Sequence, residues 1–113
     1  MSKANSVTEA TFDQEVLSSE TPVLVDFWAQ WCQPCLLVEP ALEQIAEERS
    51  GRLKLVKVNI DEEQGLAQRY GIASIPAMVL FKEGEPAAAA IGAQPKSALE
   101  RSLGLEPVEA EPA

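Results

Sequence analysis

The 113-residue sequence has no histidine, only two cysteines, and half as many basic residues as acidic ones. A structural zinc site needs four ligands, so two thiols without histidine leave such a site incomplete. Nine Lys and Arg against 18 Asp and Glu give a formal net charge of -9. A surface of that charge repels nucleic acid and anionic membranes, so we expect no direct role on either.

Long hydrophobic segments are also missing. No apolar run approaches the roughly 18 residues needed to cross a bilayer. The N-terminal stretch MSKANSVTEATFDQEV lacks the apolar core of a signal peptide. We therefore expect a cytoplasmic protein, in a compartment that keeps most thiols reduced. This expectation weakens the hypothesis that the two cysteines form a structural crosslink.

The composition, 46% hydrophobic and 24% charged, is that of an ordinary globular protein. A chain of this length forms one domain with a core that needs no crosslinks. We expect this domain to span residues 1–104. The remaining residues, 105–113, are acidic and contain proline, and we expect them to be a disordered tail.

Strands and helices alternate along the sequence, which indicates an α/β architecture. The hydrophobic patterns predict strands at 23–28, 53–60 and 77–81 and helices at about 11–17, 35–50, 61–70 and 95–103. Thr11 and Gln14 resemble a capping box, and Asp61 is the expected cap of the third helix. Residues 86–91 are ambiguous, because four alanines favour a helix whereas the turn at 83–84 and Gly92 favour a hairpin strand.

Cys32 and Cys35 lie in the segment WCQPC, between a predicted strand and a predicted helix. Residues spaced i and i+3 in a first helical turn share a face and can reach disulfide distance. As a crosslink the pair would contribute only about 2 kcal/mol, because the closed loop has four residues. As metal ligands the two thiols would need a second chain to complete a site.

Redox chemistry suits this position better. The thiolate is the nucleophile in thiol–disulfide exchange, and a helix N-terminus stabilises the thiolate with unpaired N–H groups and the helix dipole. Cys35 would then lie within reach to release a mixed disulfide formed on Cys32. A CxxC motif after a strand and before a helix therefore favours a redox centre.

Several separated motifs occur in order along the chain: VLVDFWAQWCQPC, a predicted helix that contains Pro40, VKVNID, YGIASIPAMVLFKEG, and IGA at 91–93. On these segments, the chain resembles the thioredoxin family over about residues 7–103. It implies a central mixed β-sheet flanked by helices on both faces. It also implies a monomeric thiol–disulfide oxidoreductase that reduces protein disulfides, with Cys32 as nucleophile and Cys35 as resolving residue.

The resemblance further implies no bound cofactor other than the redox-active disulfide Cys32–Cys35, and no metal. The expected electron donor is a flavoprotein of the thioredoxin-reductase type, fed by NADPH, and the expected substrates are disulfide-containing proteins. An alternative from another class is a thioredoxin-fold interaction module or holdase in which the CxxC motif is not the main activity.

Asp26 interrupts an apolar strand. From the sequence alone it is either an edge residue whose carboxylate reaches water or a buried group with a raised pKa. The resemblance implies that Asp26 lies beneath the disulfide as proton acceptor for Cys35 and that Lys57 pairs with it. Alternatively, the Lys57 ammonium simply extends to the surface.

The resemblance also implies a substrate-binding surface around the active-site turn of Trp31, Gln33 and Pro34. Its expected members are Trp31, Ala73, Ile75, Pro76 and Gly92. The Ile75–Pro76 bond is expected to be cis, against the base rate for X–Pro bonds, and the Ile75 backbone to pair with an extended substrate.

Three residues depart from the usual thioredoxin pattern. Gln33 stands where glycine is usual, Leu36 where lysine is usual and Ala77 where threonine is usual. The resemblance implies that the two residues between the cysteines tune the reduction potential, and Gln33 is one of them. Leu36 enlarges the apolar surface near Cys32, which could change the choice of partner.

Overall fold

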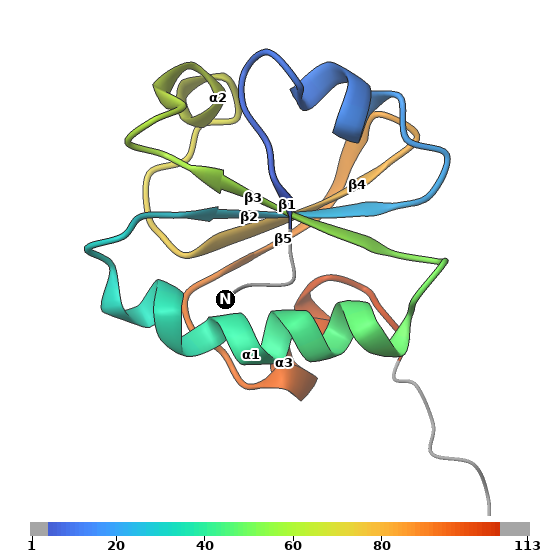
Figure 1. Cartoon of the computed structure of the whole chain (residues 1–113). Coiled ribbons are helices and arrows are strands. Elements are labelled where there is room, and N and C mark those ends of the chain that lie inside the picture. Colours follow the sequence, from blue (N-terminus) through green and yellow to red (C-terminus); the bar gives the residue numbers. More distant parts are fainter. Residues whose placement is uncertain (1–4, 107–113) are drawn as a thin grey trace, which may run out of the picture.

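The computed structural model describes residues 5–106 of the chain. Five strands form one sheet in the order β1-β3-β2-β4-β5 (Figure 1). The strands are β1 (Asn5–Ser6), β2 (Val23–Trp28), β3 (Lys54–Asn59), β4 (Ala77–Lys82) and β5 (Glu85–Ile91). Strand β3 is parallel to β1 and β2, whereas β4 is antiparallel to β2 and β5. The predicted mixed sheet is therefore confirmed.

Helices cover both faces of this sheet. Helices α1 (Gln33–Glu48) and α3 (Lys96–Ser102) lie on one face, and α2 (Gln64–Arg69) and a π-helical turn η1 (Asp13–Leu17) lie on the other (Figure 1). This arrangement confirms the predicted layers. Within residues 5–106, none of the helices combines the length and the apolar character that crossing a membrane requires.

Strand β2 lies at the centre of the sheet and is buried on both faces, which explains its nearly continuous run of apolar residues. Val23, Val25 and Phe27 point toward η1 and α2, and Leu24 points toward α1 and α3. By this alternation Asp26 faces α1. The hypothesis that Asp26 lies at a sheet edge is wrong.

The ambiguous segment 86–91 belongs to strand β5, which forms a hairpin with β4. Glu83 and Gly84 have φ values of 53° and 81°, and two consecutive positive φ values are typical of the turns that join hairpin strands. The turn therefore overrides the helical propensity of the four alanines.

Both predicted helix caps are wrong. The Thr11 hydroxyl accepts a hydrogen bond from the Thr8 N–H at 2.9 Å, and η1 begins only at Asp13. Helix α2 begins three residues after Asp61, and its Gly65 N–H donates to the Glu9 carboxylate at 2.7 Å. A residue 56 positions away thus caps α2, which no local sequence pattern reveals.

Arg49 ends α1 and joins it to the C-terminal part of the domain. The buried guanidinium donates to the Ile45 carbonyl at 3.1 Å and to the Glu100 carboxylate of α3 at 2.9 Å.

Leu105, the first residue of the predicted tail, is partly buried and packs against the core between the sheet and α1. The tail residues 107–113 lie outside the described part of the chain.

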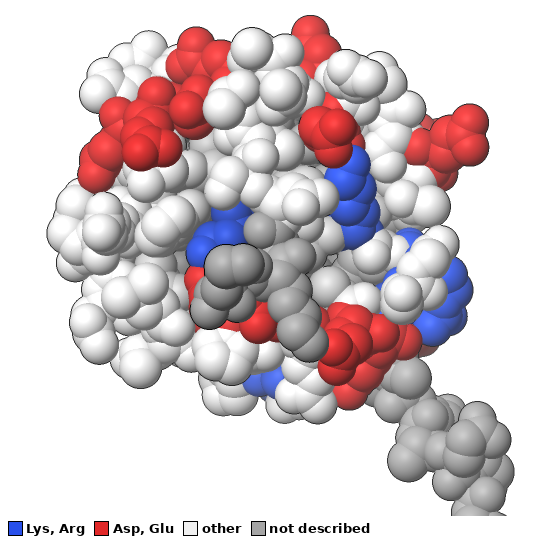
Figure 2. All heavy atoms as spheres, in the orientation of Figure 1, with Lys and Arg blue, Asp and Glu red and all other residues white. Residues whose placement is uncertain are grey.

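Acidic side chains dominate the charged surface but are unevenly placed. In the view of Figure 2 they gather over the α2 side of the sheet and near the end of α1. The region over the first turn of α1 is mainly uncharged on this face. On this face, the charged side chains therefore lie mainly away from the first turn of α1.

We predict that Glu100→Ala lowers the free energy of unfolding by about 3 kcal/mol, because the substitution removes the buried carboxylate that lies closest to the Arg49 guanidinium and leaves only the more distant Glu48. Denaturant unfolding followed by tryptophan fluorescence measures this change. Glu20→Ala is the control, since Glu20 is exposed and should change stability by less than about 0.5 kcal/mol. Equal effects of the two substitutions would contradict a structural role for the Arg49–Glu100 pair.

Candidate active site

The two cysteines form a disulfide at the junction of β2 and α1, with Cα atoms 5.3 Å apart. Cys32 is the N-cap of α1 and Cys35 lies in the first helical turn. Gln33 and Pro34 occupy the exposed turn between them. Proline is suited to this position because the first N–H groups of a helix have no intrahelical partner. The predicted spacing thus places both sulfur atoms at a helix N-terminus.

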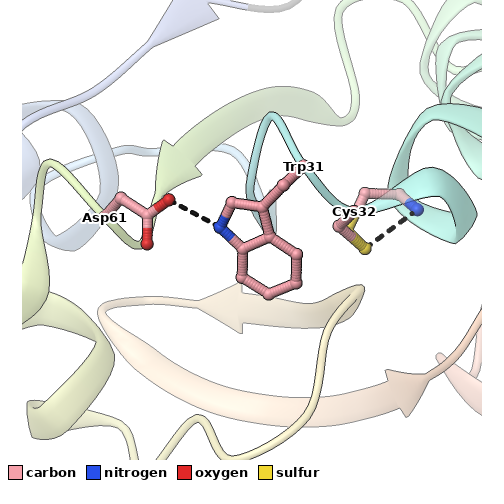
Figure 3. Close-up of a disulfide and its surroundings, with 4 residues drawn as sticks. Trp31, Cys32 and Asp61 are labelled. Carbon is pink, nitrogen blue, oxygen red and sulfur yellow. Dashed lines mark hydrogen bonds between the residues drawn. A yellow bond between two sulfur atoms is a disulfide. The ribbon is translucent and has the colours of Figure 1, made fainter.

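The backbone around the disulfide directs N–H groups toward Cys32. The Cys35 N–H donates to Cys32 Sγ at 3.2 Å, as the dashed line in Figure 3 shows. The first turn of α1 contains no acidic side chain. Since the helix dipole and this N–H group favour negative charge at Sγ, the site stabilises a Cys32 thiolate once the disulfide is reduced.

Trp31 stands beside the disulfide, with 69% of its surface exposed. Its indole N–H donates to Asp61 Oδ2 at 2.8 Å, and the ring lies between Asp61 and Cys32 (Figure 3). Asp61, which the sequence suggested as a helix cap, is therefore the residue that orients Trp31. Because most of the Trp31 ring remains exposed, the hydrogen bond holds a large apolar surface beside Cys32.

The predicted substrate-binding residues lie on segments near the disulfide. Ile75 packs against the cluster of Ala29, Cys32 and Cys35. The Ile75–Pro76 peptide bond is cis, as expected, and the Pro76 carbonyl accepts the Gly92 N–H at 2.8 Å. These contacts bring Ile75, Pro76 and Gly92 together.

Ala73 is the exception among these residues. It is exposed and precedes Ile75 by two residues. No hydrogen bond or core contact among the described residues ties Ala73 to the cysteines.

The large apolar side chains that are exposed within the described range lie in two short segments. Leu36 and Leu37 are 44% and 67% exposed in the first turns of α1, which begins two residues after Trp31, and Ile91 is 53% exposed beside Gly92 in the sequence. This clustering agrees with the uncharged region over the start of α1 in Figure 2. Exposed apolar groups gathered in one place are typical of a binding surface.

Asp26 is almost completely buried, with 1% of its surface exposed. Its Oδ1 atom has no hydrogen-bond partner within residues 5–106. Burial raises the pKa of Asp26 to about 7, and the nearby Lys57 ammonium offsets part of the increase. A carboxyl group with this pKa can take up and release a proton near neutral pH.

Lys57 lies directly beside Asp26 on the neighbouring strand β3. The whole residue is 6% exposed, so the hypothesis that Lys57 extends to the surface is wrong. Its ammonium forms an ion pair with the Glu39 carboxylate of α1 and lies 4.1 Å from the centre of the Trp28 ring. The expected direct pairing with Asp26 is not among the ion pairs of the described residues.

Glu39 and Asp61 belong to this region although neither was expected there from the sequence. Glu39 carried a signal that could have been used, because it follows Cys35 by four residues and so lies next to it along α1. Asp61 carried no such signal, since its contact with Trp31 bridges 30 positions. No group of three or more metal-ligating side chains occurs within the described range.

We predict that Asp26→Asn stabilises the oxidised protein, and increasingly so as the pH rises from about 4 to 7. In this range the folded state retains the Asp26 proton that the unfolded state loses, so the stability of the parent protein falls with rising pH. The difference between a pKa of 3.8 and one of about 7 corresponds to roughly 4 kcal/mol above pH 7.

Denaturant unfolding of both proteins between pH 4 and 8 measures this effect. Asp13→Asn is the control, because the Asp13 side chain is 77% exposed, and its effect should vary little with pH. A stability difference between Asp26→Asn and the parent that does not change with pH would show that Asp26 is already ionised throughout this range.

Comparisons with known proteins agree with this site. The thioredoxin family model matches residues 3–104. Thioredoxin 1 of Nostoc sp. is 50% identical over 103 residues, which cover 91% of this chain and 96% of the relative. Thioredoxin 1 of Synechococcus elongatus is 52% identical over the same shares. The thioredoxin of Porphyra purpurea is 52% identical over 97 residues, or 86% of this chain and 91% of its own.

The family model spans nearly the whole chain, and the three relatives are similar to this chain over nearly their full length. The residues that the family model matches include the CxxC pair, which lies at disulfide distance at the start of α1. The protein therefore belongs to the thioredoxin family and is a thiol–disulfide oxidoreductase.

Proposed function

We propose that this protein reduces the disulfides of other proteins through attack by Cys32 and resolution by Cys35. The observation that carries the assignment is the position of Cys32 at the N-cap of α1, where its Sγ accepts the Cys35 N–H. The N-cap sulfur has the better stabilised thiolate and is the better leaving group. Cys35 lies one turn into the helix and is 2% exposed.

The reaction has two steps. In the first, the Cys32 thiolate attacks a substrate sulfur, a Cys32–substrate disulfide forms, and the other substrate sulfur leaves as a thiolate that takes a proton from water. In the second, Cys35 loses its proton and its Sγ attacks Cys32 Sγ. The Cys32–substrate bond breaks, the second substrate thiolate leaves, and the Cys32–Cys35 disulfide forms.

Asp26 is the proposed acceptor of the Cys35 proton. Both residues face the layer between the sheet and α1, and the pKa of Asp26 is raised to about 7 by burial. A base with a pKa near the working pH accepts a proton in the resolving step and returns it afterwards. The positive charge of Lys57 partly compensates the negative charge of an ionised Asp26 in the same layer.

The proposed substrate is an extended segment with apolar residues beside its disulfide. Trp31, Leu36 and Leu37 offer exposed apolar surface around the start of α1. Ile75 packs against the cysteines, and the Gly92 N–H donates to the Pro76 carbonyl. Backbone pairing with Ile75 would add direction to these contacts, and Ala73 would extend the surface.

The proposal includes the electron donor and the setting. A flavoprotein of the thioredoxin-reductase type would reduce the Cys32–Cys35 disulfide, and the protein would act as a monomer in the cytoplasm. The proposal requires no bound cofactor or metal, because the disulfide itself carries the two electrons.

We predict that Cys32→Ser abolishes the dithiothreitol-driven reduction of insulin, whereas Cys35→Ser accumulates a mixed disulfide with the substrate. Insulin turbidity and non-reducing electrophoresis with mass spectrometry measure the two effects. Ser50→Ala, a substitution at an exposed residue beyond α1, is the control. Trapping by Cys32→Ser would reverse the roles, and undiminished insulin reduction by Cys32→Ser would favour the interaction module or holdase.

We predict that Leu36→Lys lowers the pKa of Cys32 in the reduced protein by about 0.6. An ammonium about 7 Å from the sulfur, at an effective dielectric constant of about 60, stabilises the thiolate by about 0.8 kcal/mol. Thiolate absorbance against pH measures the change, which should shrink as salt screens the charge. Leu36→Gln is the uncharged control. An equal change in both variants would rule out a charge effect.

A further inference from the structure

Lys57 is shared between two carboxyl groups that come from different elements. Asp26 of β2 and Lys57 of β3 are directly opposite one another in the parallel register and face α1. Glu39 of α1 approaches the same lysine from the helix side and forms an ion pair with it. The Lys57 side chain is 7% exposed and that of Glu39 is 26% exposed. The three groups therefore form one partly buried cluster between the sheet and α1.

The cation in this cluster is held by Glu39. The Lys57 ammonium donates to Glu39 Oε2 and lies over the Trp28 ring, 4.1 Å from its centre. By contrast, Asp26 Oδ1 is buried without a hydrogen-bond partner in the described range. Lys57 thus neutralises Glu39 by direct contact and acts on Asp26 only through space.

The side chains that face Asp26 come from strands β3 and β4 and from helix α1. Strand β3 supplies Lys57, and β4 places the uncharged Met78 opposite Asp26. Helix α1 supplies Glu39 and the disulfide of Cys32 and Cys35, whose thiols titrate only after reduction. Glu39 is therefore the group in this cluster whose charge has the same sign as an ionised Asp26.

We propose that Glu39 is a positioning residue for the resolving step: it holds the Lys57 ammonium at α1 and so keeps Asp26 able to exchange a proton near neutral pH. The inference rests on the proposed role of Asp26 as acceptor of the Cys35 proton. Glu39 touches neither sulfur atom and takes up no proton in the reaction. It acts through the position of Lys57.

The electrostatics of Asp26 support this role. Burial raises its pKa most, Lys57 lowers it, and Glu39 raises it further. If Lys57 were released from Glu39, it could pair with Asp26 directly, and an opposite charge at contact distance lowers a carboxyl pKa by about one to three. Asp26 would then remain ionised well below neutral pH and would be a weaker base for the Cys35 thiol.

The test is Glu39→Gln, which keeps the size of the side chain and removes its charge. Carbon-13 NMR titration of the Asp26 carboxyl group in the oxidised protein should show a pKa lower by at least about one. The rate of the resolving step is measured in single turnovers of the reduced protein with a chromogenic aromatic disulfide. In the plot of this rate against pH, the fall at low pH (the acid limb) should move to lower pH by a similar amount. An Asp26 pKa that is unchanged or higher would overturn the inference.

Two comparisons separate this mechanism from a general effect of charge. Glu47→Gln removes the same charge from α1 two turns further along and should leave the Asp26 pKa within about 0.2 of its parent value, since an exposed charge at that distance is largely screened. In a Lys57→Met background, Glu39→Gln should change the Asp26 pKa by less than half as much. An equal effect of Glu47→Gln, or an undiminished effect without Lys57, would overturn the inference.

A conservative variant and Asp26→Asn complete the design. Glu39→Asp retains a carboxylate and should restore most of the parent Asp26 pKa and pH profile, and failure to do so would count against the ion pair.

Asp26→Asn should remove the acid limb of the resolving rate. If the limb persists in Asp26→Asn, the proposed role of Asp26 falls and the positioning role falls with it. If the limb disappears but Glu39→Gln shifts nothing, only the role of Glu39 falls.

Discussion

The burial of one carboxyl group, Asp26, is the constraint on which the rest of the site depends. Asp26 lies on the central strand β2 beneath α1, where the folded protein excludes water from it. Burying an unpaired carboxylate in such a place costs free energy, so burial raises the pKa of Asp26 to about 7. The fold thereby holds a neutral-pH acid–base group in the same layer as the cysteines, without using histidine.

The helix that covers Asp26 also presents the disulfide. The sharp transition from β2 to α1 places Cys32 at the N-cap, and the inward-facing stripe of Cys35, Val38, Leu42 and Ile45 fastens α1 to the sheet. Because that stripe fixes the rotation of the helix, it also directs Glu39 toward Lys57. One amphipathic pattern therefore determines the sulfur chemistry, the cover over Asp26 and the position of the buried cation.

Much of this could be predicted from the sequence, and the failures have physical causes. The alternating strands and the CxxC spacing are local signals, and the structure places β2, α1 and the disulfide where those signals indicate. The capping of α2 by Glu9 and the contact of Trp31 with Asp61 join residues 56 and 30 positions apart, so no local rule finds them. The partner of Lys57 was missed because two carboxylates compete for it, and only packing decides between them.

The distribution of charge shows why the helix terminus matters so much here. A chain with a net charge of -9 has a field that disfavours a thiolate, and Leu36 supplies no compensating cation beside Cys32. Screening limits the reach of the surface carboxylates to about 10 Å, and the surface near the first turn of α1 is mainly uncharged in Figure 2. Negative charge on Cys32 must therefore be stabilised by short-range dipoles, above all the Cys35 N–H at 3.2 Å. On the proposed function, a substrate that covered the exposed apolar surface of Leu36 and Leu37 would strengthen that interaction, because removing water lowers the local dielectric constant.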